Sequence, residues 1–186
     1  MIYNEKLFKL NDGSFAIAKS PKVADARKLI NNIIRVAEST HELLSEPEDF
    51  KPFLEDITKE EKFIESFNNN QNYLICVYVN DEIIGNCALN FKTHLKDKHR
   101  ATVGIAIEKE YQDKGIGSFL FDEMINIAKN TEGVEQLELD VAKTNERAKH
   151  LYSKKGFVKV GDLPHELKLS DGSYIDGEKM VLFLNN

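Results

Sequence analysis

Two glycines, Gly115 and Gly117, lie where a strand-like run gives way to a helical pattern in the stretch EYQDKGIGSFLFDEM (residues 110–124). Glycine permits positive φ and tight packing, so the pair is compatible with a simple strand-to-helix turn. It is equally compatible with an anion site, because the first backbone N–H groups of a helix lack partners and the helix dipole is positive there. In that arrangement Ser118 supplies a hydroxyl donor and Lys114 a positive charge. The glycines alone do not choose between these interpretations.

Two common nucleotide-binding loops do not fit this stretch. The third glycine of a Rossmann G-x-G-x-x-G fingerprint would fall at position 120, which is Leu120. A P-loop needs a Lys-Ser or Lys-Thr pair after its glycine, and none follows at the required spacing.

A second segment, TNERAKHLYSKKGF (residues 144–157), carries Asn145, Ala148 and Tyr152 at spacings of three and four. One face of a helix would then present an amide near its start, a small residue, and a phenol two turns later. Asn145 also suits an ordinary helix N-cap, and Tyr152 suits simple packing, so both need the context of the first motif.

Together the two segments resemble the GNAT superfamily of N-acetyltransferases. The family's Q/R-x-x-G-x-G/A loop is matched by Gln112, Gly115 and Gly117, and its N-x-x-A-x-x-L-Y-x-x-x-G-F pattern by Asn145 through Phe157. The end of the chain also looks like the last hairpin of the polyamine and amino-acid acetyltransferase branches. The resemblance implies acetyl-CoA as co-substrate and a V-shaped gap between the strand ending near Glu108 and the strand beginning near Gln136.

The resemblance assigns cofactor contacts to three parts of the chain. Backbone groups of two strand residues would pair with pantetheine like an added strand, the glycine loop would hold the pyrophosphate, and the later helix would add side chains. These residues are Ala106, Ile107, Gln112, Asp113, Lys114, Gly115, Ile116, Gly117, Ser118, Asn145 and Tyr152. Asp113 stands where many relatives carry glycine, and its carboxylate would repel a pyrophosphate unless it faces solvent or Lys114 offsets it. Gly104, within the apolar strand, marks either a bulge, a close approach by another chain, or an ordinary weak point.

The implied chemistry is attack of a neutral amine on the thioester carbonyl. The backbone N–H near Ile107 would donate to the oxyanion, and Tyr152 would act as the general acid that protonates the departing sulfur. No general base is evident. The segment that follows the first amphipathic helix offers Glu38, His41 and Glu42 as substrate-pocket candidates, although a solvated loop explains each of them as well.

The function predicted in this way is acetyl transfer from acetyl-CoA to a primary amine of a small molecule such as a polyamine, an amino acid or an amine-bearing antimetabolite. A noncatalytic acyl-CoA-binding regulatory module, or an acetyltransferase acting on protein N-termini or lysines, is the alternative. A homodimer is expected because relatives are often dimers.

The pattern of apolar residues predicts the elements that must position these groups. Helical spacing covers residues 21–39, 58–70, 116–130 and 145–155, with a capping box of Thr58 and Glu61 at the start of the second helix. Strand patterns cover residues 13–20, 73–79, 83–91, 101–107 and 134–142 and two final strands around LSDGSY. We therefore expect one α+β domain (1–186) with α/β character at its centre: a mixed twisted sheet of about six or seven strands and about four helices.

Composition limits the partners, location and metal content expected for this domain. A net charge of −6 argues against broad nucleic-acid binding, and no apolar run is long enough to span a membrane, so we expect a cytoplasmic protein. The five histidines show no metal-ligand spacing, so no metal is expected. Cys76 and Cys87 lie in two runs that may form a hairpin, where they could face one another as buried free thiols.

Overall fold

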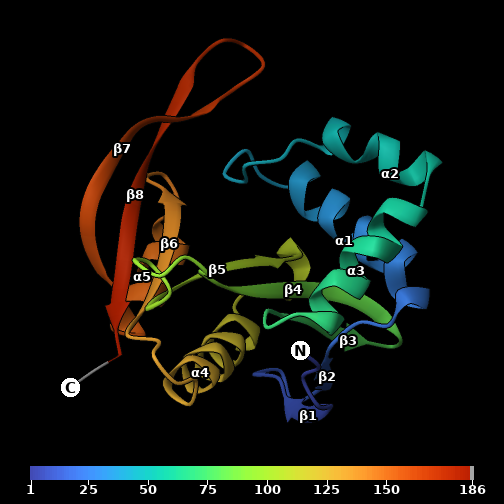
Figure 1. The fold of residues 1–186 in the computed structure, drawn as a ribbon. Coiled ribbons are helices and arrows are strands. Elements are labelled where there is room, and N and C mark those ends of the chain that lie inside the picture. The colour runs from blue at the N-terminus through green and yellow to red at the C-terminus, as the bar shows by residue number, and fades with distance from the viewer. Residues whose placement is uncertain (185–186) are drawn as a thin grey trace. The chain divides into compact units, whose positions relative to one another are not determined.

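The computed structural model describes residues 1–184 and has the expected α/β architecture (Figure 1). Its sheet has eight strands in the order β1-β2-β3-β4-β5-β6-β8-β7. The strands are β1 (Lys6–Lys9), β2 (Phe15–Lys19), β3 (Tyr73–Val79), β4 (Glu82–Phe91), β5 (Arg100–Ile107), β6 (Gln136–Ala142), β7 (Val158–Lys168) and β8 (Tyr174–Phe183). Among the described residues, the α-helices are α1 (Ala26–Glu38), α2 (Lys51–Glu55), α3 (Thr58–Asn69), α4 (Ile116–Lys129) and α5 (Glu146–Lys154).

The sheet is mixed, as predicted. The β5–β6 pair is parallel, whereas the ladders β1–β2, β2–β3, β3–β4, β6–β8 and β7–β8 are antiparallel. The sequence missed β1 and α2, which raises the counts to eight strands and five α-helices.

The chain divides into two compact units, each described by itself below. The first unit contains residues 1–40, 45–90 and 104–117, and the second contains residues 41–44, 91–103 and those from 118 onward. Strand β5 contributes to both, since the division falls between Val103 and Gly104. The extent of a single domain over 1–186 stays a prediction.

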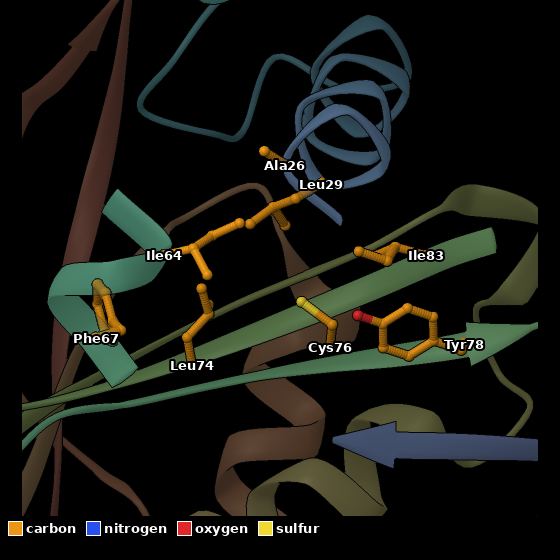
Figure 2. Close-up of a cluster of buried hydrophobic side chains, with 8 residues drawn as sticks. All are labelled: Ala26, Leu29, Ile64, Phe67, Leu74, Cys76, Tyr78 and Ile83. Carbon is orange, nitrogen blue, oxygen red and sulfur yellow. The ribbon is translucent and has the colours of Figure 1, made fainter. Parts of the chain in front are cut away.

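The core of the first unit lies between two helices and the β3–β4 hairpin. Leu29 of α1 and Ile64 of α3 are fully buried, and both point at strand residues that include Leu74 and Cys76 (Figure 2). Burying an aliphatic side chain of this size contributes about 1.5–3 kcal/mol, so these contacts hold α1 and α3 on one face of the sheet.

The N-terminus of α3 differs from the predicted capping box. Thr58 is the first helical residue and Ile57 is the N-cap, which has no side-chain cap. The backbone N–H and hydroxyl of Thr58 instead donate to the Asp56 carboxylate, at 3.2 and 2.5 Å. The prediction was wrong because an acidic residue two positions earlier captures both donors.

The two cysteines do not face one another, so the prediction that Cys76 and Cys87 could face one another across the hairpin was wrong. Cys76 lies opposite Asn86 and Cys87 opposite Ile75, so the cysteines are one step out of register. Successive residues of a strand point to opposite faces, and the two thiols are therefore on opposite faces of the hairpin. Both are free and buried, and burial raises the pKa of each thiol above its ordinary value.

The second unit is organised around β6. This strand pairs with β8 over its whole length, while its parallel ladder with β5 covers only Arg100–Thr102. Arg100 of β5 and Glu138 of β6 form a bidentate ion pair across this short ladder, and the Glu138 side chain is 3 % exposed. Paired hydrogen bonds of this type fix geometry as well as adding energy, so the ion pair links the two strands across the whole of this three-residue ladder.

Candidate active site

The loop between β5 and α4 takes a shape that few residues tolerate. After a 3-10 turn at Lys109–Tyr111, Asp113 has φ of 59° and Gly115 has φ of 89°. Glycine adopts that conformation without strain, whereas a side chain at Gly115 would also approach Asn11 Oδ1 at 3.0 Å. Gly117 follows within the first turn of α4. The predicted roles of the two glycines therefore differ: Gly115 shapes the loop and Gly117 lies at the helix N-terminus.

Asn11, in the turn between β1 and β2, forms two hydrogen bonds with this loop. Its side-chain amide donates to the Asp113 carbonyl at 3.0 Å, and its backbone N–H donates to the Lys114 carbonyl at 3.1 Å. Two successive carbonyls of the loop are thus directed at Asn11. Sequence analysis missed this residue, and no local pattern signals it.

Side chains of the loop are also engaged within the first unit. Gln112 Nε2 donates to the Ile107 carbonyl at 3.1 Å, which ties the start of the loop to the end of β5. Lys114 Nζ lies 3.1 Å from Asp12 and 5.1 Å from the centre of the Tyr111 ring. Hydrogen bonds from Ser14, and then the ammonium of Lys114, lower the pKa of Asp12 to about 2.

Asp113, the residue that departs from the family pattern, is exposed. Its backbone, at positive φ, presents the carbonyl to Asn11. Lys114 forms an ion pair with Asp12, and charge compensation of Asp113 by Lys114 stays a prediction.

The end of β5 lies very close to β4. A methyl group added at Gly85 would approach the Ala106 carbonyl oxygen at 3.1 Å and Ile107 Cγ1 at 3.3 Å, which is tighter than an ordinary contact, so this close approach favours glycine. Gly104 is different, because a methyl group there would meet no atom of the described chain within 4 Å. Packing within the described part of the chain therefore gives no reason for Gly104.

In the second unit, the later motif forms α5 and the turn before it. Asn145 is the N-cap, and its Oδ1 accepts a hydrogen bond from Ala148 N–H at 3.0 Å. Tyr152 is 8 % exposed, and its ring packs 5.0 Å from Phe121 and 6.1 Å from Phe157. The capping role of Asn145 and the packing role of Tyr152 are thus both present, and both are compatible with cofactor contacts.

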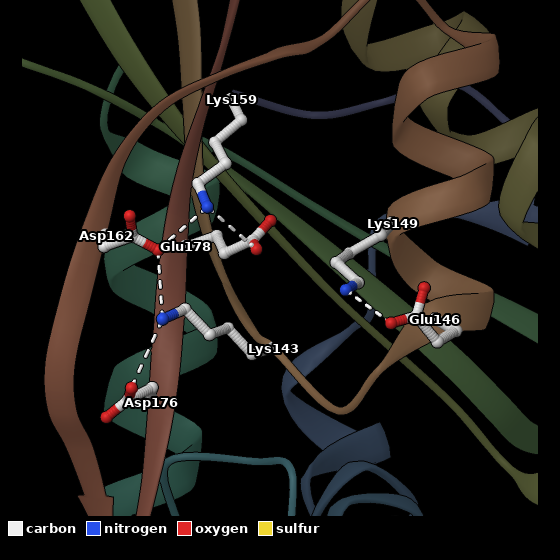
Figure 3. A network of polar contacts seen from close by, with 7 residues as sticks. All are labelled: Lys143, Glu146, Lys149, Lys159, Asp162, Asp176 and Glu178. Atoms are coloured by element: carbon white, nitrogen blue, oxygen red, sulfur yellow. Dashed lines mark hydrogen bonds and ion pairs between the residues drawn. The ribbon is translucent and has the colours of Figure 1, made fainter.

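A polar network fixes the chain just before Asn145. Lys143 Nζ lies 3.0 Å from Asp162 and 3.2 Å from Asp176, while Lys159 bridges Asp162 and Glu178 (Figure 3). Hydrogen bonds from Lys159, followed by those from Lys143, lower the pKa of Asp162. These contacts join the β6–α5 turn to the β7–β8 hairpin.

The three predicted substrate residues fall in two different units, and their substrate roles stay predictions. Glu38 and His41 are exposed, and Glu42 accepts a hydrogen bond from Thr144 Oγ1 at 2.9 Å. Glu38 belongs to the first unit, whereas His41 and Glu42 belong to the second.

The first unit contains a partly buried polar cluster that sequence analysis also missed. Glu108, directly after β5, accepts hydrogen bonds from Asn32 Nδ2 and Arg35 Nε, both at 2.8 Å. Asn86 Nδ2 in turn donates to Asn32 Oδ1 at 2.8 Å. A signal existed in the sequence, since Asn32 interrupts the apolar face of α1 between buried Leu29 and Val36.

Among the described residues, no group of three or more His, Cys, Asp or Glu side chains is placed to hold a metal ion. Within the same residues, no helix combines the length and apolar character needed to cross a bilayer.

Residues 26–157 match the family model described as the acetyltransferase (GNAT) family. The matched range contains the strand, glycine loop and helix, and the strand and capped helix that follow them. The chain belongs to the GNAT family. This membership confirms the resemblance read from the two motifs, both of which lie inside the matched range.

Curated GNAT relatives are similar over part of their length. The chain is 26 % identical over 103 residues to L-amino acid N-acetyltransferase AaaT of Escherichia coli K12, covering 55 % of this chain and 63 % of that protein. It is 34 % identical over 84 residues to the spermidine N(1)-acetyltransferase of the same strain, covering 45 % of each. These matches therefore span less than two thirds of either relative.

Solved structures show the same fold over nearly the whole chain. A GNAT acetyltransferase from Streptococcus pneumoniae superposes with a TM-score of 0.81 at 23 % identity, covering 90 % of this chain and 99 % of that chain. A Salmonella typhimurium structure solved with its cofactor acetyl-CoA gives 0.77 at 14 % identity, covering 92 % and 95 %.

Proposed function

We propose that this GNAT protein transfers the acetyl group of acetyl-CoA to a primary amine of a small molecule, by direct attack of the amine on the thioester. The observation that carries the proposal is the loop from Gln112 to Gly117. Because the carbonyls of Asp113 and Lys114 turn toward Asn11, the N–H groups at the start of α4 are left to bind an anion such as the pyrophosphate of acetyl-CoA.

The residues of the first unit would bind and orient the co-substrate. Backbone groups of Ala106 and Ile107 lie beyond the ladder that ends at Thr102, and they are proposed to pair with pantetheine. The N–H of Ile107 would donate to the oxyanion, and Gly115, Ile116, Gly117 and Ser118 would surround the phosphates together with Gln112, Asp113 and Lys114. The Gln112 bond to the Ile107 carbonyl supports this arrangement because it couples the phosphate loop to the oxyanion donor.

The second unit would supply the remaining groups. Asn145 is proposed to contact the cofactor while it caps α5, and Tyr152 to donate a proton to the departing sulfur. The aromatic contacts of Tyr152 with Phe121 and Phe157 support this role because they restrict the ring, so the phenol is held in one orientation.

Small-molecule amines are the preferred acceptors because the chain resembles an amino-acid and a spermidine acetyltransferase. An acceptor on a protein N-terminus is the second candidate, since the chain is also 36 % identical over 80 residues to the N-alpha-acetyltransferase of Saccharolobus solfataricus. A cytoplasmic location and a homodimer stay predictions, as do substrate roles for Glu38, His41 and Glu42.

The test is release of free thiol from acetyl-CoA in the presence of amines. We expect release above the amine-free rate with at least one amino acid, polyamine or related amine, and an acetylated product of the corresponding mass. Release only with peptides that carry a free N-terminus would favour the second candidate. Binding of acetyl-CoA without release for any acceptor would favour a noncatalytic acyl-CoA-binding module.

A further inference from the structure

The carboxylate of Glu108 is held through one oxygen only. Oε1 accepts hydrogen bonds from Asn32 Nδ2 and from Arg35 Nε, both at 2.8 Å, and Arg35 Nη2, which donates to the Ile83 carbonyl, lies 2.7 Å from Oε1 as part of the ion pair. Asn32 is fully buried and the Glu108 side chain is 13 % exposed. Two hydrogen bonds and an ion pair on one oxygen restrict the orientation of the whole carboxylate, because the group is planar and rigid.

The second oxygen, Oε2, has no hydrogen bond within residues 1–184. It is also absent from the fully buried unsatisfied side-chain atoms of that part of the chain, so it keeps contact with solvent. An ionised carboxylate offers about four acceptor positions, and leaving those of Oε2 unused is costly unless water or a ligand occupies them. The contacts that link Glu108 to α1 use Oε1 alone, so they do not explain the position of Oε2.

The backbone places Glu108 next to the reaction centre of the proposed function. Glu108 directly follows Ile107, the proposed oxyanion donor, and the N–H of Glu108 donates to the Ile84 carbonyl at 3.0 Å. On the other side, Gln112 holds the Ile107 carbonyl. The residue pair that would face the thioester is therefore fixed by β4, by α1 and by the phosphate loop.

We propose that Glu108 is a substrate-binding residue whose Oε2 accepts an N–H of the acceptor amine and directs the nitrogen lone pair at the acetyl carbonyl. This inference rests on the proposed function. In the reaction the C–N bond forms, the C–S bond breaks, one amine proton leaves the nitrogen and one proton ends on the sulfur of CoA. Glu108 orients the amine and need not take up this proton.

Arg35 explains why the carboxylate does not simply trap an ammonium ion. Its guanidinium lies within hydrogen-bonding distance of Oε1, so the pair carries no net charge. A positive charge near an amine disfavours protonation, and the neutral amine is the form that attacks. The Arg35–Glu108 pair thus offers an acceptor for N–H while giving little stabilisation to the cation.

The variant Glu108→Gln separates amine binding by Oε2 from the contacts that Oε1 makes with Asn32 and Arg35. Glutamine keeps a carbonyl oxygen for Asn32 and Arg35 but replaces Oε2 with an NH2 group, which cannot accept a hydrogen bond. We expect the KM for the best amine to rise by about 10- to 100-fold with the acetyl-CoA Kd unchanged, and the melting temperature to fall by a few degrees at most, because the charge-assisted bonds from Asn32 and Arg35 become neutral ones. Glu110→Gln, an exposed position two residues later, is the matched control and should alter none of these values.

The outcomes separate this inference from the function on which it rests. An unchanged amine KM in a folded Glu108→Gln protein overturns the role of Glu108 while leaving acetyl transfer intact. No thiol release by the wild type with any amine overturns the proposed function and the inference together. If Glu108→Gln does not fold, the assigned Glu108 carboxylate ¹³C resonance of the wild type with bound CoA decides: a shift on amine saturation supports contact, and no shift overturns it.

Discussion

The side chain of Asn11 determines the shape of a loop that lies 102 residues later in the chain. The side chain occupies the space beside Gly115 and donates to the Asp113 carbonyl, while the backbone N–H of Asn11 donates to the Lys114 carbonyl. A contact of this kind fixes a binding loop before the ligand arrives, which reduces the ordering cost of binding.

Asn11→Ala removes the hydrogen bond to the Asp113 carbonyl and leaves a gap beside Gly115. A hydrogen bond contributes about 1 kcal/mol, so we expect acetyl-CoA affinity to fall roughly five- to tenfold in calorimetric titration. Ser14→Ala changes the same turn without touching the loop and should bind acetyl-CoA like the wild type. Equal affinities for all three proteins would show that the loop keeps its shape without Asn11.

Tyr152→Phe tests the proposed general acid. The ring contacts with Phe121 and Phe157 are retained, so stability and acetyl-CoA affinity should change little. Because proton donation commonly contributes 100-fold or more, we expect turnover to fall by about 100-fold and the alkaline limb of the pH–rate profile to change. Turnover and a pH profile equal to those of the wild type would leave Tyr152 with a packing role.

Local spacing reveals some site residues and hides others. Gly115, Gly117, Asn145 and Tyr152 belong to two short segments, where residues three or four positions apart share a face. Asn11 and Glu108 act through partners 102 and 73–76 residues distant, and only the folded chain brings those partners together. Asn32 was visible as a polar residue on an apolar helix face, although its partner was not.

At the scale of elements, β5 depends on close contact with β4. Gly85→Ala places a methyl group 3.1 Å from the Ala106 carbonyl, a contact that forces the end of β5 to shift. Overpacking of this kind costs about 1–3 kcal/mol, and the shift moves the proposed pantetheine-binding backbone. We expect a lower urea midpoint and weaker acetyl-CoA binding.

Gly104→Ala is the matched control for stability, since a methyl group there has no neighbour in the described chain within 4 Å. Its urea midpoint should equal or slightly exceed that of the wild type, because alanine reduces the freedom of the unfolded chain. If Gly85→Ala is as stable as Gly104→Ala, the β4–β5 contact has room to adjust.

Long amphipathic elements were predictable and short ones were not. Seven strands and four helices follow from runs whose alternation or helical spacing extends over several residues. Strand β1 has four residues and α2 has five, one of them proline, so the pattern of each repeats too few times to stand out from a loop. The Thr58 cap failed for a different reason, because the helix begins one residue earlier than the capping box requires and Asp56 accepts from both donors of Thr58.

At the scale of the whole molecule, the β5–β6 ladder links local geometry to function. The Arg100–Glu138 ion pair, of which only the carboxylate is buried, joins the first residue of the ladder to the residue opposite Thr102, and the ladder ends at Thr102 although both strands continue. Unpaired strand backbone exposes donors and acceptors that an extended ligand can satisfy. The early end of this ladder supports the proposal that the cofactor pairs with β5 beyond Thr102, which the motifs alone implied only by resemblance.

Whole-molecule stability should depend on the protonation of Glu60. This α3 residue is 5 % exposed, its Oε1 is buried without a hydrogen-bond partner, and burial raises the pKa of its carboxyl group to about 7. Since the folded-state pKa exceeds the ordinary value of 4.5, the folded protein binds the proton more tightly than the unfolded chain. This contribution is complete below pH 4.5 and is lost as the pH rises to about 7, with a total of up to about 3 kcal/mol.

Glu60→Gln removes the buried ionisation while keeping the side-chain shape. We expect the variant to be more stable than the wild type at pH 8 and to lose most of that advantage at pH 5, in urea unfolding followed by circular dichroism. Glu65→Gln, an exposed position on the same helix, should follow the wild type at both pH values. A constant difference between Glu60→Gln and the wild type from pH 5 to pH 8 would mean that Glu60 titrates alike in the folded and unfolded chains, because only a pKa difference makes stability depend on pH.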